Sequence, residues 1–311
     1  MDFQRPATDY APRAATNVSL EELVRSAERV EKGVPLTAEL DQALFHGSPI
    51  GGARPKALIE DHDTKYIAKF SSTSDLYSLV KAEFIAMRLA KLAGLDVASV
   101  SLTTSAHKDV LLIERFDRLH RARGWQRKAM VSAPTLLELE DIMARYAGYA
   151  GLAEIVRHRF TKAAATLREL FGRLVFNILC GNTDDHARNH AAFWDGEALT
   201  LTPAYDICPQ GRTGNEATQA MLITDQDRMS RISTCLGAAG HFLLSREAAL
   251  AIVEHQLRTI IAHWENVCDE AALSPVDRAF LWGRQFLNPF AFEDLTGDAA
   301  PIKTLADEAR A

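Results

Sequence analysis

The apolar and polar positions divide the chain into a strand-rich stretch and a helix-rich one. Between about residue 44 and Asp117, short runs separated by polar turns predict a small sheet. Beyond residue 118 the helical period takes over, most clearly over residues 161–180, where Gly181 ends the helix. We therefore expect an α+β fold with a small sheet-rich N-terminal lobe and a larger helical C-terminal lobe.

The elements expected in the first half follow from local signals. Ser19 and Glu22 form a capping box that begins a helix, and Gly33 and Pro35 end it. Strands are predicted at residues 56–60, 65–70, 97–103 and 110–114. One helix, residues 76–92, is inserted between them.

The second half is expected to be mainly helical. Ala133 to Thr135 should begin a polar, Glu-rich helix. Asp195 and Gly196 predict the turn of a hairpin between residues 190–194 and 198–202, and two more helices are expected near residues 245–267 and 274–286. The chain then has three parts, which are a flexible lead with one helix (1–36), the N-lobe (37–117) and the helical C-lobe (118–311).

Composition excludes several classes of protein. Hydrophobic residues make up 47% of the 311 and charged residues 24%, as in ordinary globular proteins. With 35 Lys and Arg against 41 Asp and Glu, the net charge of −6 excludes the basic surface that grips nucleic acid directly. No apolar run reaches the roughly 18 residues of a membrane span, and there is no secretion signal or C-x-x-C pair. We expect a cytoplasmic protein with reduced thiols.

Residues 181–190, Gly-Asn-Thr-Asp-Asp-His-Ala-Arg-Asn-His, concentrate polar side chains in a loop between a helix and a hairpin. Asp184 and Asn189 are five residues apart, and Asp206 follows the hairpin. Because a strand, a turn and a strand return the chain to its start, Asn189 and Asp206 should lie side by side. Oxygen ligands in such an arrangement suit Mg²⁺.

Two other interpretations of this loop are open. Asp and Asn side chains often cap loop backbone without further function. Alternatively His186 and His190, an i, i+4 pair, could bind zinc with Asp185. The zincin pattern places a Glu directly after its first His, whereas this chain has Ala187 there.

The N-lobe adds candidate groups for binding phosphate. Gly51, Gly52 and Ala53 form a turn whose bare backbone N–H groups can approach phosphate oxygens. Lys69 lies on a strand, opposite in parity to its buried neighbours. Glu83 interrupts an apolar stripe of the next helix, and a carboxylate there is costly unless it is paired. Lys69 is the nearest basic residue on the preceding strand, so a Lys69–Glu83 pair is expected beside the glycine turn, with the ammonium directed at nucleotide phosphates.

The segment between the lobes, residues 111–118, is an apolar strand that leads into charged residues. Its exposed backbone groups could bind an adenine edge. An ordinary strand end with surface charges explains the pattern equally well.

Together these motifs resemble the HipA family of serine/threonine kinases, the toxins of type II toxin–antitoxin systems. The matching stretches are residues 51–57, 67–69, 83–95, 113–118, 183–190 and 201–206. The Thr-Asp-Asp-His-x-x-Asn block followed by Pro-x-Tyr-Asp is the most specific part. The resemblance implies a two-lobed protein-kinase-like fold that uses ATP and Mg²⁺.

The resemblance also implies a role for each matching residue. Asp184 would accept the proton of the attacking hydroxyl, and Asn189 and Asp206 would hold Mg²⁺. Lys69 would bind the nucleotide phosphates with Glu83 as its partner.

On the adenosine side, the resemblance assigns the backbone of Glu114 and Phe116 to adenine and Asp117 to the ribose. His186 would be a structural or nucleotide-side member of the loop.

Family membership further implies partners and regulation. Fewer than fifty residues precede the glycine loop, which begins at Gly47, so the N-terminal domain of longer members would be absent or supplied by a small separate protein. Members autophosphorylate a serine in this loop, and Ser48, next to Pro49, is the candidate here. The expected substrate is an aminoacyl-tRNA synthetase. A separate helix-turn-helix antitoxin would contact DNA, so this chain would reach DNA only indirectly.

Two other functions stay open. One is a nucleotide-binding pseudokinase that acts as a scaffold or corepressor, although every catalytic position is filled. The other is a small-molecule phosphotransferase of the aminoglycoside-kinase type. Those enzymes usually have an H-x-D order in the catalytic loop, whereas Asp184 precedes His186 here.

Overall fold

The computed structural model describes residues 19–31, 34–35, 56–72, 75–122, 124–224 and 226–311. The N-lobe is built on a four-stranded antiparallel sheet with the strand order β1-β2-β4-β3. Its strands are β1 (Lys56–Asp61), β2 (Thr64–Phe70), β3 (Val100–Ser105) and β4 (Lys108–Glu114). The tight turn between β1 and β2 places Lys56 directly opposite Lys69.

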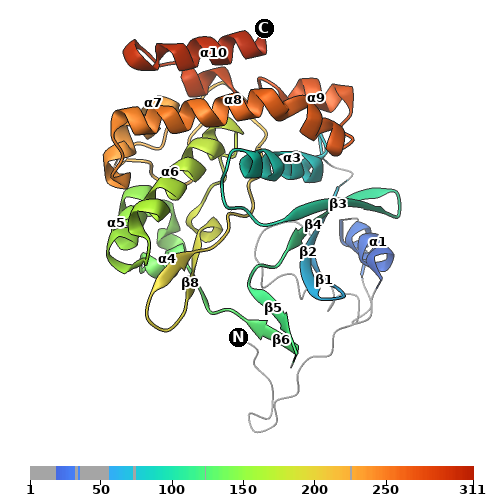
Figure 1. The fold of residues 1–311 in the computed structure, drawn as a ribbon. Coiled ribbons are helices and arrows are strands. Elements are labelled where there is room, and N and C mark those ends of the chain that lie inside the picture. The colour runs from blue at the N-terminus through green and yellow to red at the C-terminus, as the bar shows by residue number, and fades with distance from the viewer. Residues whose placement is uncertain (1–18, 32–33, 36–55, 73–74, 123, 225) are drawn as a thin grey trace.

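The two faces of this sheet are covered by different helices. α1 (Leu20–Glu31) packs Leu23, Val24 and Ala27 against one face in a small core that includes Ala68. The expected capping box is confirmed, because the Ser19 N–H donates to Glu22 (3.0 Å) and the Glu22 N–H donates to the Ser19 hydroxyl (3.2 Å). α3 (Leu79–Leu92) lies against β3 and β4 (Figure 1). Its buried side chains belong to the same hydrophobic core as those of the C-lobe.

The C-lobe is arranged around one buried helix, α6. Its α-helices are α4 (Ala133–Leu136), α5 (Tyr149–Arg159), α6 (Ala163–Leu179), α7 (Ile232–Ala238), α8 (Arg246–Glu270), α9 (Pro275–Leu281) and α10 (Ala300–Arg310). Every residue from Leu170 to Leu179 is buried, because α5, α7 and α8 all pack against α6. α8 also contacts α3 and so joins the lobes (Figure 1). Within the described ranges, no helix is both long and apolar enough to cross a membrane.

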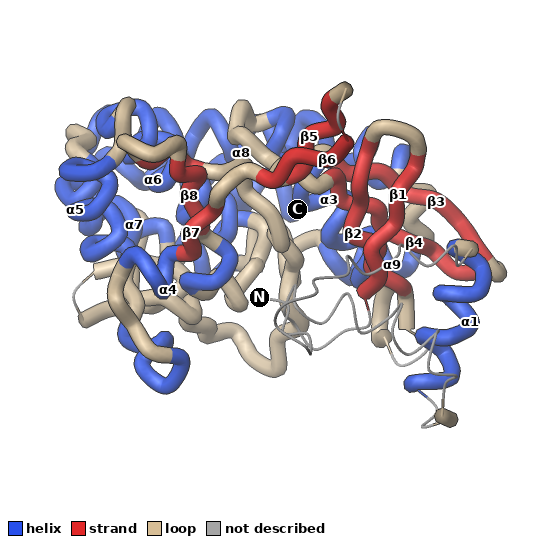
Figure 2. The backbone as a smooth tube through the Cα atoms, turned by 90° about the horizontal axis from the view of Figure 1, so that it is seen from below, coloured by secondary structure: helices blue, strands red, loops and turns tan. Residues whose placement is uncertain are grey.

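Two small sheets lie between the main parts (Figure 2). One joins β7 (Met130–Ser132), β8 (Ala191–Trp194) and β9 (Leu199–Leu201), and the other is the hairpin of β5 (Arg118–Arg121) and β6 (Gly124–Arg127). The hairpin lies against the N-lobe, because the Trp125 indole N–H donates to Glu60 (2.8 Å). The strand-rich part therefore extends past Asp117, the residue at which the sequence analysis places the boundary between the N-lobe and the C-lobe.

Several sequence-based boundaries are wrong. The helix expected over residues 76–92 begins only at Leu79, and Leu76 is 93% exposed. The Glu-rich helix does not form. α4 ends after four residues, because Glu138 has a φ of +55°, which is outside the range of a right-handed helix. The helix expected to reach residue 286 ends at Leu281, and α5, α7 and α10 were not anticipated.

Gly181, which begins the polar loop, has a φ of +73°, and a Cβ there would lie 2.5 Å from the Gln285 carbonyl oxygen. Gly181→Ala is therefore expected to lower the free energy of unfolding by about 3 kcal/mol, since it adds a backbone clash to a strained φ. Gly196→Ala is the control, because its φ is +109° but, apart from its chain neighbours, no described residue has an atom within 4 Å of the added carbon. It should cost only about 1 kcal/mol. Equal losses in urea unfolding would contradict the role of the close contact.

Candidate active site

Lys69 lies where the two lobes meet. Its Nζ is 2.6 Å from Glu83 Oε1 on α3, and it also contacts Asp206 Oδ1, which lies 137 residues further along the chain. Lys69 and Glu83 are both buried. The ion pair expected from strand parity and the interrupted apolar stripe is therefore present, and it includes a second carboxylate.

The electrostatics of this cluster follow from burial and close opposite charges. Burial raises the pKa of Glu83, and although Lys69 lowers it, the nearby Asp206 raises it further, so it lies above its usual value. Burial also raises the pKa of Asp206, but Lys69 more than offsets this and the pKa falls below its usual value. Burial lowers the pKa of Lys69, yet Glu83 and Asp206 together raise it above the ordinary range. We conclude that Lys69 is charged and Asp206 ionised.

Lys56 is a member of this cluster that the sequence analysis missed. It lies opposite Lys69 in the β1–β2 ladder, and burial followed by repulsion from Lys69 lowers its pKa. Counting back from the β1–β2 turn would have identified it, because the register of a hairpin is fixed by its turn. Two lysines and two carboxylates therefore lie in one region between the lobes.

Asp184 is exposed on the polar loop, and within the described part of the chain its carboxylate makes no hydrogen bond. Its backbone carbonyl accepts from the His186 N–H (2.9 Å) and from Asn189 Nδ2 (3.3 Å). The carboxylate is thus free for chemistry. Because the amide nitrogen of Asn189 is used by the loop, its Oδ1 is left for another ligand.

The hairpin returns the chain as expected. β8 and β9 pair antiparallel, the Thr202 N–H donates to the Ala191 carbonyl (3.0 Å), and the Tyr205 hydroxyl donates to the Arg188 carbonyl (2.9 Å). Tyr205 and Asn189 line the same small cavity. Asp206, the next residue, has a φ of +61°. Such backbone strain is frequent at functional sites.

The donor set suits Mg²⁺ and does not suit zinc. Asn189 and Asp206 offer an amide and a carboxylate oxygen, and Mg²⁺ is typically held by one or two protein oxygens together with water and phosphate. His190 Nε2 instead lies 2.8 Å from Asp185 Oδ1, with both side chains buried. Among the residues whose placement is described, no three His, Cys, Asp or Glu side chains could hold a metal ion.

The segment between the lobes agrees only in part with the expected adenosine site. The Glu114 N–H donates to the Ser99 carbonyl (2.9 Å), so it is not free for a base. Phe116 packs its ring against Phe193 and Tyr205.

Asp117 differs more from expectation. It is buried, and its carboxylate binds Arg115 (2.7 Å) and also Arg118. Two guanidinium groups therefore hold the side chain expected at the ribose. Burial raises the pKa of Asp117, but these groups lower it below the usual value. In this structure Asp117 stabilises the connection between the lobes.

The remaining predicted residues are of two kinds. His186 is half-buried and close enough to lower the pKa of Asp206. Its Nδ1 is buried and has no partner within the described residues. Ser48, Gly51, Gly52 and Ala53 lie outside the described residues, so their predicted roles stay predictions.

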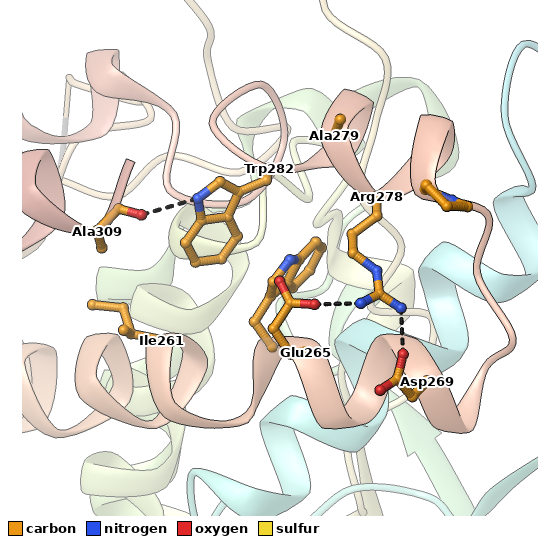
Figure 3. Close-up of a pocket in the computed structure, with 9 residues that line it drawn as sticks. Ile261, Glu265, Asp269, Arg278, Ala279, Trp282 and Ala309 are labelled. Atoms are coloured by element: carbon orange, nitrogen blue, oxygen red, sulfur yellow. Dashed lines mark hydrogen bonds and ion pairs between the residues drawn. The ribbon is translucent and has the colours of Figure 1, made fainter. Parts of the chain in front are cut away.

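A larger hollow, of about 700 Å³, lies away from this site between α8, α9 and α10 (Figure 3). Trp264 and Trp282 form its apolar wall, and the Trp282 indole N–H donates to the Ala309 carbonyl (3.1 Å). Arg278 binds Glu265 and Asp269 across the opening. Its charges are thus internally paired, and it shares no residue with the Lys69 cluster.

The small antiparallel sheet, the helical lobe and the Lys–Glu–Asp cluster between them define a two-lobed, protein-kinase-like fold. Residues 48–264 match the model of the HipA-like C-terminal domain, and the chain belongs to this family.

Individual relatives agree with this assignment. The serine/threonine-protein kinase toxin HipA of Shewanella oneidensis is 30% identical over 160 residues, which is 46% of this chain and 36% of that protein. Matches to the curated relatives span between 33% and 52% of their lengths.

Solved structures support the fold. HipA in the complex of Shewanella oneidensis HipA, HipB and operator DNA superposes with a TM-score of 0.71 at 20% identity, covering 98% of this chain and 73% of that one. The proinflammatory kinase CtkA of Helicobacter pylori gives 0.53 at 14% identity, covering 82% and 89%.

Proposed function

We propose that the chain is an ATP- and Mg²⁺-dependent protein serine/threonine kinase. The observation that carries the proposal is the contact of Lys69, from the N-lobe, with Asp206 of the C-lobe and Glu83 of α3. A cation for the phosphates and a carboxylate for the metal are what phosphoryl transfer requires from the protein. Bound Mg²⁺ would offset charge on the transferred phosphoryl group, and Asn189 and Asp206 would hold it.

Within this proposal Asp184 accepts the proton of the attacking hydroxyl, since its carboxylate is exposed and makes no hydrogen bond to any described residue, on the loop that also carries Asn189. Lys69 orients the phosphates, and Glu83 holds its ammonium in place. Because the Glu114 N–H is occupied, the Glu114 carbonyl and the Phe116 backbone are the candidates for the base.

We further propose that the protein is the toxin of a type II toxin–antitoxin system. Family membership and the name of the Shewanella oneidensis relative support this. The neighbouring HipA structure contains HipB and operator DNA, which favours a helix-turn-helix antitoxin as partner and DNA contact only through it. The proposed substrates are an aminoacyl-tRNA synthetase and Ser48 of the chain itself.

The kinase proposal is tested by incubating the protein with ATP labelled at the γ-phosphate, with Mg²⁺ or with EDTA. Because the metal offsets phosphate charge, label should enter protein serine or threonine only with Mg²⁺, and ATP labelled at the α-phosphate should transfer none.

Other outcomes favour the alternatives. Nucleotide binding without label transfer to any acceptor, including a panel of candidate synthetases, would support the pseudokinase scaffold. Label recovered on an aminoglycoside-like compound would support the small-molecule phosphotransferase.

A further inference from the structure

Asp185 is buried beside an exposed catalytic candidate. It directly follows Asp184 yet is only 2% exposed. His190 Nε2 donates to its Oδ1 (2.8 Å), and the Tyr149 hydroxyl donates to its Oδ2. A buried carboxylate is tolerated only with such compensation.

The donors come from separate parts of the C-lobe. Tyr149 is the first residue of α5, and His190 is the last residue of the polar loop. Tyr149 is itself fixed, because its N–H donates to the Leu222 carbonyl (2.8 Å) and its ring packs on those of His190 and Phe242. Asp185 therefore ties the loop to α5 in the main core.

Asp185 and His190 occupy informative positions in the loop. Each directly follows a residue assigned to the chemistry, because Asp184 precedes Asp185 and Asn189 precedes His190. Their hydrogen bond closes the segment that contains the short 3-10 helix η3 (Ala187–Asn189). The two buried side chains thus fix the loop at two points, next to the candidate base and next to the candidate metal ligand.

An apolar pair would fill this part of the core at lower desolvation cost, because a buried charged group often contributes no net stability. What the hydrogen bonds provide is direction, since they fix both the distance and the orientation of the groups they join. Catalysis is sensitive to such placement, and a shift of about 1 Å can cost about a hundredfold in rate.

We propose that Tyr149, Asp185 and His190, here called the loop anchor, are positioning residues that hold Asp184 and Asn189 at their working separation. None of the three touches substrate. The inference rests on the proposed kinase function and extends it by assigning residues that act through the catalytic loop.

The test compares Tyr149→Phe, His190→Leu and His190→Gln with the wild type. Tyr149→Phe removes one hydroxyl and keeps the ring contacts, and glutamine can present an N–H where His190 Nε2 presents its own. We expect kcat to fall about tenfold in Tyr149→Phe and about a hundredfold in His190→Leu, with KM for ATP changed less than about twofold. His190→Gln should recover most of the kcat lost in His190→Leu.

Hydrogen–deuterium exchange supplies a readout that does not depend on activity. Amides of residues 182–191 should exchange faster in Tyr149→Phe, while those of α8 stay unchanged. Thr259→Val is the matched control, because it removes a buried hydroxyl of α8 that donates to the His255 carbonyl (2.8 Å). It should leave kcat and loop exchange at their wild-type values.

Unchanged loop exchange in Tyr149→Phe would overturn the inference whether or not the wild type transfers phosphate. The inference would also be overturned if the loss of kcat only followed the fraction of folded protein. Equal losses of kcat in His190→Gln and His190→Leu would overturn it as well. A wild type that transfers no phosphate would overturn the proposed function and the catalytic part of the inference, whereas faster loop exchange would still establish the anchor.

Discussion

Replacing Asp184 with asparagine is expected to lower kcat for phosphate transfer by about a thousandfold, because an amide cannot accept the proton of the attacking hydroxyl. The side chain is exposed and makes no hydrogen bond within the described residues, so the free energy of unfolding should change by less than about 0.5 kcal/mol. Nucleotide affinity without metal should also be unchanged. Single-turnover transfer and urea unfolding measure the two effects.

Asp195→Asn is the matched control for this experiment. It makes the same chemical change at an exposed carboxylate of the hairpin turn, where Asp195 Oδ1 accepts from two backbone N–H groups that asparagine can also satisfy. Its kcat should equal that of the wild type. If Asp184→Asn retained wild-type transfer, Asp184 would not be the base.

The part of the site that could be predicted from sequence depends on short-range geometry. Strand parity and an interrupted apolar stripe were sufficient to place Lys69 against Glu83, because both signals come from regular elements with fixed periods. The same stripe was extended one turn too far to Leu76. Periodicity alone does not show where a helix begins, and residues 75–78 are not helical.

The parts that were missed depend on contacts between distant elements. Asp117 is an exception, because its partners Arg115 and Arg118 are sequence neighbours; the charged run does not show that the carboxylate is buried between them. Tyr149 lies 36 residues from Asp185, and no local pattern indicates that they meet. The apolar stripe of α6 predicts one buried face, whereas helices on several sides also bury Arg173 and Asn177.

The Lys69–Glu83 pair shows how stability and function separate at this site. Both side chains are buried, so removing one partner leaves a poorly solvated charge. Glu83→Gln is expected to lower the free energy of unfolding by about 3 kcal/mol, at the low end of the range for buried pairs because Lys69 keeps its contact with Asp206. Lys69→Met takes the cation from both Glu83 and Asp206, so it should cost about 5 kcal/mol, at the high end. The surface pair Lys65–Glu60 (2.9 Å) is the control, and Lys65→Met should cost under about 1 kcal/mol.

The double variant Lys69→Met/Glu83→Leu should recover about half of the stability lost in Lys69→Met, since the apolar pair removes the buried charge of Glu83 and only Asp206 still lacks its cation, yet it should transfer no phosphate. pH adds a further check. The folded-state pKa of Glu83 is already raised, and losing Lys69 raises it more. Folded Lys69→Met then binds a proton more tightly than the unfolded chain, so its stability should increase as pH falls and decrease as pH rises through that pKa. Urea unfolding at several pH values measures both effects. A double variant as unstable as Lys69→Met would show that an unpaired buried charge is not the cause of the lost stability.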